Sequence, residues 1–316
     1  TKCKLVQLKD RYNLKYMYGP DYGYRTGINK TMSLHVKRIT KILSKKVNLK
    51  KNDLVLDIAS NDGCLLNYYG KNIIKCGIDP ILNKYKNNYK KIKYSIPTFF
   101  SAKKIKNKTN KKFKIITALS VFYDAEDPNK FLKDVRSLLM PNGIFLVEFA
   151  DLASIIRFKM FDTICHEHLE YYSSKVIINL AENNGLKVFD IKENKINGGS
   201  KQYYLCLKNS SISVNTKIIN KTLSSENKLK LNKVSTFVEF FKEINKLKFD
   251  LNNIIQSILN KNQNIHCYGA STKGNVILQY FKIDDKKIKF VAERNKNKYG
   301  LYAPGTNIKI ISEKQS

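Results

Sequence analysis

The alternation of short apolar segments with helical segments between residues 54 and 150 constrains the fold of this chain most. Residues 54–58 (LVLDI) predict a strand, and a turn rich in Asn, Asp, Ser and Gly leads into a helix that begins near Gly63. Pro128 suits the first position of a helix over residues 128–139. The strand pattern recurs in three further segments, 73–80, 114–122 and 144–150. This alternation predicts a parallel sheet with helices on both faces.

The pattern changes in the second half of the chain. Residues 185–208 hold two β-rich runs joined by a turn with two glycines, which predict an antiparallel pair at the sheet edge. The polar stretch 209–225 predicts a domain boundary, and residues 227–260 carry apolar side chains at helical spacing. A strand, a glycine-bearing turn and a helix follow from residue 262. We therefore expect a second, smaller α/β unit that is cut off at Ser316.

The strong positive charge of the chain does not by itself indicate a nucleic-acid partner. The formal net charge is +32, but only six of the 58 basic residues are arginine, the side chain preferred for bidentate phosphate and base contacts. The lysines alternate with asparagine in stretches such as 102–114, and such runs usually mark solvated surface. No Pro-Pro or Pro-Cys dipeptide of the kind used by base-methylating enzymes occurs. We expect no nucleic-acid partner.

Cysteine usage and hydropathy indicate a cytoplasmic protein. The six cysteines are scattered without paired spacing, which suits reduced thiols. No apolar run approaches the about 18 residues that a membrane span needs, so we expect no membrane partner. Because the first residue is Thr1 rather than methionine, we also expect that a segment before it is missing.

A cofactor site is predicted where the first strand meets its helix. Asp57 ends the strand, Ser60 and Asn61 tighten the turn, and Gly63 lets the backbone approach a ligand at a helix N-terminus. The loop lacks the three spaced glycines of a dinucleotide fingerprint, so an amino-acid moiety fits better than a pyrophosphate. Asp79 ends the second strand, at about the spacing at which a carboxylate meets ribose hydroxyls. The alternative is a flavodoxin-like or dehydrogenase-like unit with incidental acids.

The segment FDTICHEHLEYYS, residues 161–173, places His166 and His168 on either side of Glu167. Metal ligation would need a different spacing, since a helical zinc pair stands four residues apart. Two core histidines enclosing a carboxylate would need many buried hydrogen bonds. An imidazole with a pKa of about 6.5 accepts a proton at neutral pH, and a neighbouring carboxylate can orient it. We favour acid–base catalysis.

Five segments together resemble the S-adenosylmethionine-dependent sugar C-methyltransferases, which act on nucleotide-linked 4-keto-deoxysugars: VLDIASNDG, GIDP, FDTICHEHLEYYS, NGGS and YGASTKGN. The resemblance runs through nearly the whole chain, and its HEH motif is quite specific. It implies a Rossmann-like class I methyltransferase domain over residues 30–208, with an antiparallel strand pair at the edge of a parallel sheet. Residues 1–29 would be the remnant of an N-terminal zinc-binding module and a linker, and residues 209–316 a truncated α/β substrate domain.

The resemblance also implies roles for single residues. His168 resembles the catalytic base and Glu167 its supporting carboxylate, and His166 is a third catalytic candidate. The S-adenosylmethionine site would combine the loop residues with one more strand end: Asp57, Ser60, Asn61, Gly63, Asp79 and Ser120. The substrate-binding candidates are Tyr22, Tyr24, Tyr171, Tyr172, Asn197 and Lys273. Segment 22–27 (YGYRTG) and His35 resemble the part of the family that reaches the active site.

Three positions qualify the resemblance. Cys165 stands where members with established sugar chemistry tend to have tyrosine, and Ala59 replaces a glycine of the cofactor loop. Cys3 resembles the last cysteine of the zinc module. Because its partners would lie before Thr1, we expect zinc only in the full-length protein and no metal site in this chain.

The implied chemistry is the methylation of a carbon next to a ketone. A base removes the acidified proton, a tyrosine (Tyr24, Tyr171 or Tyr172) stabilises the enolate oxygen, and the carbanion attacks the sulfonium methyl group. Lys273 would hold a diphosphate at the helix that starts near Gly274, although an ordinary strand–helix turn explains this segment equally well. A small-molecule O- or N-methyltransferase, a nucleic-acid methyltransferase and a non-catalytic cofactor-binding protein remain as alternatives.

Overall fold

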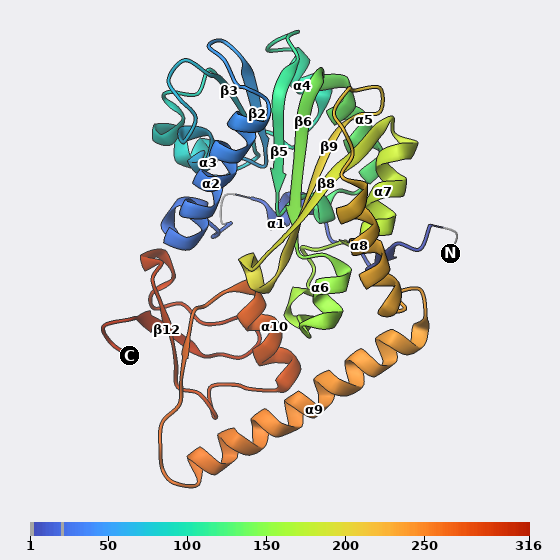
Figure 1. Ribbon diagram of the computed structural model, residues 1–316. Helices are drawn as coiled ribbons and strands as arrows, with labels where there is room; N and C mark the ends of the chain where they lie inside the picture. The colour runs from blue at the N-terminus through green and yellow to red at the C-terminus, as the bar shows by residue number, and fades with distance from the viewer. Residues whose placement is uncertain (1–2, 20–21) are drawn as a thin grey trace. The chain divides into compact units, whose positions relative to one another are not determined.

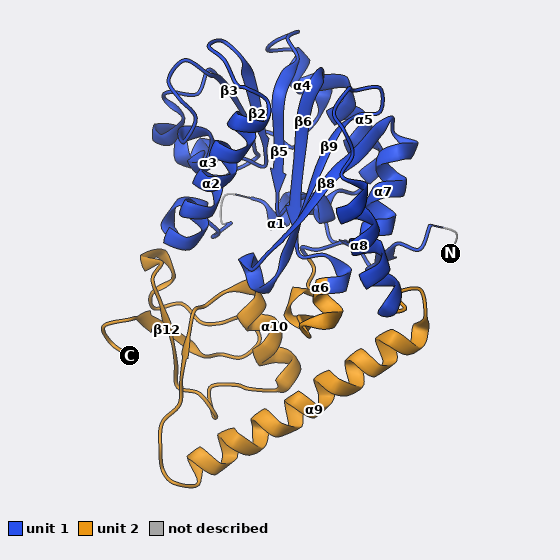
Figure 2. Ribbon diagram, viewed as in Figure 1, with its two compact units in different colours: residues 1–153, 167–229 blue, residues 154–166, 230–316 orange. Residues whose placement is uncertain are grey.

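The computed structural model describes residues 3–19 and 22–316 and divides the chain into two compact units. The first unit comprises Thr1–Ala153 and Glu167–Leu229, and the second comprises Ser154–His166 and Lys230–Ser316 (Figure 2). The chain therefore passes from one unit to the other within the HEH motif.

The described part of the first unit holds a seven-stranded sheet in the order β4-β3-β2-β5-β6-β9-β8 (Figure 1). Its strands are β2 (Leu54–Ile58), β3 (Ile74–Ile78), β4 (Tyr94–Ile96), β5 (Phe113–Leu119), β6 (Leu139–Phe149), β8 (Leu186–Asn194) and β9 (Ser200–Leu207). The first five strands in this order, β4, β3, β2, β5 and β6, pair in parallel with their neighbours, whereas β9 pairs antiparallel with both β6 and β8. The predicted Rossmann-like methyltransferase fold with its antiparallel edge pair is confirmed.

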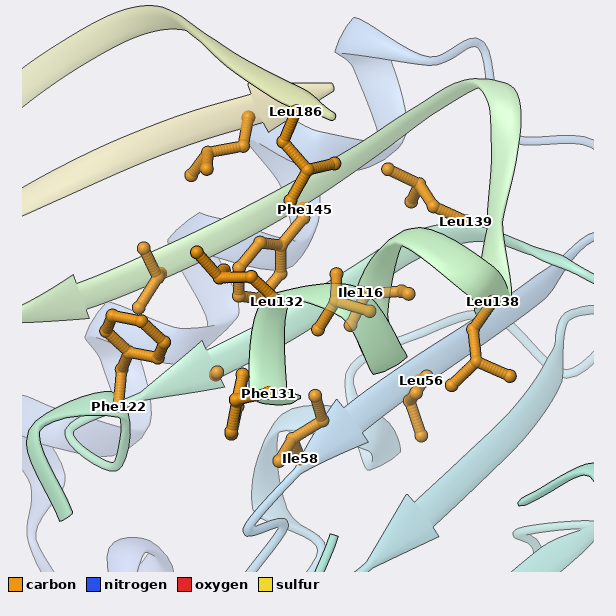
Figure 3. Close-up of a cluster of buried hydrophobic side chains, with 14 of the residues drawn as sticks. Leu56, Ile58, Ile116, Phe122, Phe131, Leu132, Leu138, Leu139, Phe145 and Leu186 are labelled. Atoms are coloured by element: carbon orange, nitrogen blue, oxygen red, sulfur yellow. The ribbon is translucent and has the colours of Figure 1, made fainter. Parts of the chain in front are cut away.

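Helices cover both faces of this sheet, because neighbouring strand residues point to opposite sides. Leu56 and Ile58 join one core cluster with α5 (Pro128–Leu138) and α7 (Ser174–Asn183), and Figure 3 shows Phe131, Leu132 and Leu138 of α5 packed there. Val55 joins the other cluster with α2 (Lys30–Lys46). Helix α5 begins as predicted, since the Asp127 side chain accepts the Lys130 N–H at 2.9 Å and Pro128 follows the cap. Two further helices of this unit, α3 (Cys64–Asn67) and α4 (Ala102–Lys106), are short.

The predicted boundary stretch 209–225 is instead mostly helical. Helix α8 (Thr216–Lys228) packs on β8 and α7, and Ile218 and Ile219 contact the core cluster that contains α5. These contacts join α8 to the sheet, and the compact first unit extends to Leu229.

The N-terminal segment also belongs to the first unit. Strand β1 (Val6–Gln7) pairs antiparallel with β7 (Glu170–Tyr171), directly after the HEH motif, and the Leu8 N–H donates to the Leu169 carbonyl at 2.9 Å. Helix α1 (Leu14–Met17) and segment 22–29 then lead into α2. The segment predicted as a linker is thus hydrogen-bonded to the motif.

The described part of the second unit holds a parallel three-stranded sheet in the order β10-β11-β12. Its elements are α6 (Leu152–Arg157), which begins in the first unit, α9 (Val234–Leu259), β10 (His266–Tyr268), α10 (Thr272–Phe281), β11 (Phe290–Glu293) and β12 (Lys309–Ser312). Phe161 stacks on Phe281 with ring centroids 5.1 Å apart, which attaches segment 154–166 to α10. Across the described residues of both units, no helix combines the length and apolarity required to cross a membrane.

Candidate functional site

Left-handed backbone shapes the loop after β2. Ala59 (φ 54°), Asn61 (φ 49°) and Gly63 (φ 71°) all lie in this region, which costs a residue with a Cβ about 1–2 kcal/mol. Gly63 escapes this cost and also leaves space, since a Cβ there would lie 3.1 Å from the Tyr89 ring. The loop is therefore a strained, tightly packed turn that leads into α3.

Two buried carboxylates hold this loop. Asp79, after β3, accepts the Asn61 N–H and the Ile81 N–H, each at 2.8 Å. Asp57, at the end of β2, accepts the Thr117 hydroxyl at 2.6 Å. Burial raises the pKa of Asp57 to about 7, against the opposing effect of the Thr117 hydrogen bond and with a further increase from Asp79.

Segment 24–27 is hydrogen-bonded to the same loop. The Thr26 N–H donates to Asn61 Oδ1 at 3.0 Å, and Asn61 Nδ2 donates to the Tyr24 carbonyl at 3.1 Å. Gly27 N and Arg25 Nε donate to Asp62 Oδ2 at 3.0 and 3.1 Å. Asp62 was not a predicted site residue. The sequence indicates Asp62 only as a second acidic residue of this turn, directly after Asn61.

The predicted cofactor residues of the loop come together in a way that fits S-adenosylmethionine. Each Asp79 oxygen accepts one backbone N–H and keeps a second lone pair, so ribose hydroxyls have acceptors there. Ser60 Oγ accepts the Tyr89 hydroxyl at 2.8 Å, and a Cβ at Gly77 would lie 2.8 Å from that same oxygen. The glycine in β3 thus allows the loop to sit close to the sheet, beside the Asp79 carboxylate.

Ser120, the remaining cofactor candidate, directly follows β5 and lies beside a buried polar network. Its backbone is left-handed (φ 54°), and its N–H donates to the Glu148 carbonyl at 2.7 Å. The Glu148 side chain is 2% exposed and lies 2.8 Å from His35 Nε2 and 2.5 Å from Gln202 Nε2. His35 was a predicted site residue, but Glu148 was not. The sequence indicates Glu148 only by placing an acidic residue inside the apolar run IFLVEFA.

The HEH motif is divided between the two units. His168 is half-buried in the first unit, and its ring packs edge-on against the Tyr123 ring with centroids 4.2 Å apart. The Leu169 N–H donates to the Tyr123 carbonyl at 3.0 Å, which ties the motif to the segment after β5. Glu167 is half-buried in the same unit, whereas His166 is exposed and belongs to the second unit. Of the three catalytic candidates, His168 and Glu167 thus share a unit with the cofactor loop.

A tyrosine connects the surroundings of the motif with the cofactor loop. Tyr22 is half-buried and packs edge-on against Tyr18, with ring centroids 5.0 Å apart. Burial, followed by the negative charges of Glu167, Asp124 and, more weakly, Asp79, raises the pKa of Tyr22 well above its ordinary value. The electrostatic neighbours of Tyr22 thus include both the Glu167 of the motif and the Asp79 of the cofactor loop.

The other substrate candidates of the first unit differ in exposure. Tyr24 is 46% exposed, and Asn197 is exposed in the turn between β8 and β9. Tyr171 is buried in β7. Tyr172 is 0% exposed, stacks on Phe122 in the core and donates its hydroxyl to Glu170 at 2.8 Å. Tyr172 therefore contributes to the core rather than to a ligand surface.

Lys273 lies in the second unit, in the first turn of α10. The helix begins at Thr272, and the Ser271 side chain caps it by accepting the Gly274 N–H at 3.0 Å. Lys273 Nζ lies 3.2 Å from Asp162 Oδ2, so its charge is partly neutralised by the segment that precedes the HEH motif. A bound diphosphate would have to compete with Asp162 for this cation.

No group of three or more His, Cys, Asp or Glu side chains with metal-site geometry occurs among residues 3–19 and 22–316. Cys3, the possible last ligand of a zinc module, is exposed.

Replacing Asp79 by Asn is expected to weaken the binding of S-adenosylhomocysteine by about 10- to 100-fold, because a hydrogen bond to a charged acceptor contributes about 1.5–3 kcal/mol. Isothermal titration calorimetry measures the affinity. Asp53→Asn, before β2 at the opposite end of the sheet, removes the same charge and is expected to leave the affinity unchanged. Equal losses in both variants would contradict the assignment of Asp79 to the cofactor site.

The raised pKa of Asp57 predicts a stability that falls as the pH rises. Between the ordinary pKa of 3.8 and the folded-state value of about 7, the folded chain holds a proton at Asp57 that the unfolded chain has released. We expect the free energy of unfolding of the wild type to fall between about pH 5 and about pH 8. Measured by urea unfolding, this decrease should be about 2 kcal/mol larger than the decrease in Asp57→Asn. Parallel pH profiles of the two proteins would contradict this prediction.

The chain is similar to several known proteins. A family model described as "Methyltransferase domain" matches residues 28–191, and one described as "C-methyltransferase C-terminal domain" matches residues 195–316. C-methyltransferase NovU of Streptomyces niveus is 24% identical over 320 residues, which cover 100% of this chain and 75% of that protein.

Solved structures with a low overall similarity also match part of the chain. A S-adenosylmethionine-dependent methyltransferase from Clostridium acetobutylicum is 15% identical with a TM-score of 0.43, over 57% of this chain and 93% of that one. The magnesium protoporphyrin IX methyltransferase of Synechocystis, with bound SAH, is 14% identical with a TM-score of 0.42, over 61% of this chain and 91% of that one.

Proposed function

We propose that this chain transfers a methyl group to a carbon atom of a nucleotide-linked 4-keto-deoxysugar. The chain belongs to the methyltransferase-domain family and is an S-adenosylmethionine-dependent methyltransferase. Two comparisons support carbon as the acceptor atom. The C-methyltransferase C-terminal domain model matches residues 195–316, and the relative NovU is named a C-methyltransferase. The resemblance of the HEH segment to the sugar C-methyltransferases supports the keto-sugar.

The observation that carries this proposal is the place of His168. Its ring packs against Tyr123 after β5, and the neighbouring strand β2 leads into the cofactor loop in the same unit. A ketone acidifies the adjacent C–H bond, and a neutral imidazole is a suitable base for it near pH 7. Glu167 adjoins His168 in the chain and stabilises the imidazolium that forms.

The residues of the loop would hold the cofactor. Asp79 accepts the ribose hydroxyls, and the turn at residues 59–63 borders the amino-acid moiety. Bound S-adenosylmethionine supplies a methyl group on a positively charged sulfur. Tyr22 and Tyr24 would border the sugar, and Asn197 of the same unit is a further candidate for a substrate contact.

Mass spectrometry tests the proposal. The protein is incubated with S-adenosylmethionine and a panel of nucleotide-linked 4-keto-sugars in deuterated water. We expect one sugar to gain about 14 mass units from the methyl group. With S-adenosylhomocysteine in place of S-adenosylmethionine, we expect the same sugar to take up solvent deuterium at the carbon beside its ketone. Methyl gain on oxygen or nitrogen without deuterium uptake would favour a small-molecule O- or N-methyltransferase. Cofactor binding without transfer to any sugar would reject the sugar substrate.

A further inference from the structure

Tyr18 and Asp124 form a hydrogen-bonded pair that belongs to neither the cofactor loop nor the HEH motif and has no role in the function proposed above. Asp124 follows β5, next in the chain to the Tyr123 that contacts His168. The Tyr18 hydroxyl lies 2.8 Å from Asp124 Oδ2, although 106 residues separate the two positions. Tyr18 is half-buried, so part of its surface remains accessible to a ligand.

The Asp124 carboxyl is unusual because one of its oxygens has no partner. Asp124 is 6% exposed, and within residues 3–19 and 22–316 its buried Oδ1 receives no hydrogen bond. An ionised carboxylate with an unpaired buried oxygen is strongly disfavoured, whereas a neutral carboxyl presents only an uncharged carbonyl oxygen there. Burial raises the pKa of Asp124 well above its ordinary value, the Tyr18 hydrogen bond opposes this increase, and Glu167 and Glu170 add to it.

A neutral Asp124 sets the direction of the Tyr18 hydroxyl. The Tyr18 hydroxyl donates to Asp124 Oδ2 at 2.8 Å when the carboxyl is ionised. When Asp124 is neutral with its proton on Oδ2, the carboxyl donates to the Tyr18 oxygen across the same contact, and the Tyr18 O–H is then available to another acceptor. Burial is the largest cause that raises the pKa of Tyr18 above its ordinary value, and it acts whether or not Asp124 is charged. Tyr18 therefore keeps its proton and acts as a hydrogen-bond donor.

We propose that the Tyr18 hydroxyl donates a hydrogen bond to the substrate carbonyl oxygen as it becomes an enolate, and that Asp124 is the positioning residue that orients this hydroxyl. The inference rests on the proposed function, because it needs a substrate with a ketone. His168 takes the proton, the C–H electron pair becomes the enolate C=C bond, and the carbonyl π pair moves to oxygen. A donor aimed at that oxygen stabilises it, and a neutral Asp124 does not repel the new charge.

Solvent-deuterium uptake in the presence of S-adenosylhomocysteine tests Tyr18, because it follows enolate formation without methyl transfer. Tyr18→Phe is expected to slow uptake about 10²- to 10³-fold, the usual effect of removing one oxyanion donor. Its affinity for S-adenosylhomocysteine should not change. Tyr16→Phe is the matched control, since Tyr16 lies in the same segment and is 81% exposed.

The outcomes separate this inference from the proposed function. Uptake by the wild type with equally fast uptake by Tyr18→Phe would overturn the role of Tyr18 and leave the proposed function intact. No uptake by the wild type with any 4-keto-sugar would reject both.

Two substitutions of Asp124 test its positioning role. An asparagine amide is a neutral donor of similar shape, so Asp124→Asn is expected to retain uptake within about 10-fold, whereas Asp124→Ala loses about 10²-fold. If Asp124→Asn, with an unchanged melting temperature, is as slow as Asp124→Ala, the charged carboxylate is required and the role of a neutral Asp124 is rejected.

Discussion

Replacement of His168 by Gln is expected to lower the rate of methyl transfer by about 10²- to 10⁴-fold, the range that one general base contributes. The glutamine side chain fills a similar volume but does not accept a proton near neutral pH. Deuterium uptake beside the ketone should fall with methyl transfer, because both need the same proton removal. The affinity for S-adenosylhomocysteine should stay unchanged. Single-turnover kinetics measures the first effect, and calorimetry measures the second.

His266→Gln is the matched control for this experiment. His266 is exposed in the second unit, where its Nδ1 lies 2.9 Å from Ser316 Oγ, and its replacement is expected to leave the rate unchanged. If His168→Gln transfers methyl at the wild-type rate while it binds the cofactor normally, His168 is not the base.

Replacement of Lys201 by Met is expected to lower the free energy of unfolding by about 3–5 kcal/mol, because it leaves two buried carboxylates without their cation. Lys201 is 1% exposed, and its Nζ lies 2.8 Å from Asp151 Oδ2 and 2.6 Å from Glu226 Oε1. Burial alone would lower the pKa of Lys201, but Asp151 and Glu226 outweigh it and raise the pKa. Because Glu226 lies in α8, this cluster joins the helix to β9.

Urea unfolding of the whole chain measures this loss. Glu193→Gln is the control, because Glu193 lies 3.9 Å from the same Nζ but its side chain is 57% exposed, and an exposed pair contributes about 0–1 kcal/mol. Equal stabilities of Lys201→Met and the wild type would show that the buried cation is not needed to hold α8 on the sheet.

Much of the turn at residues 59–63 was predictable because its determinants are neighbours in the chain. Asp57, Ser60, Asn61 and Gly63 lie within seven residues, and their order after an apolar strand already predicts a turn at a helix N-terminus. The hydrogen bonds from segment 24–27 to Asn61 and Asp62 were not predictable, since no local pattern pairs these segments.

The attachment of the polar stretch 209–225 to the sheet was not predictable for a related reason. Residues 209–225 are polar on average, and composition alone indicates a linker. Glu226, which directly follows this stretch in α8, nevertheless accepts hydrogen bonds from Lys201 and from the Ser174 backbone N–H, so the helix is tied to the sheet by groups far away in the chain.

The sequence by itself determined the class of fold, the turn after the first strand of the sheet and the motif that contains His168, because strand and helix periods and short motifs depend on residues close together in the chain. Only the tertiary structure decided which distant side chains meet. His35 reaches Glu148 across 113 positions and Tyr18 reaches Asp124 across 106, and β1 pairs with the strand that follows the HEH motif. Such contacts result from the packing of helices and loops around a completed sheet, and the spacing of apolar residues along the chain does not predict them.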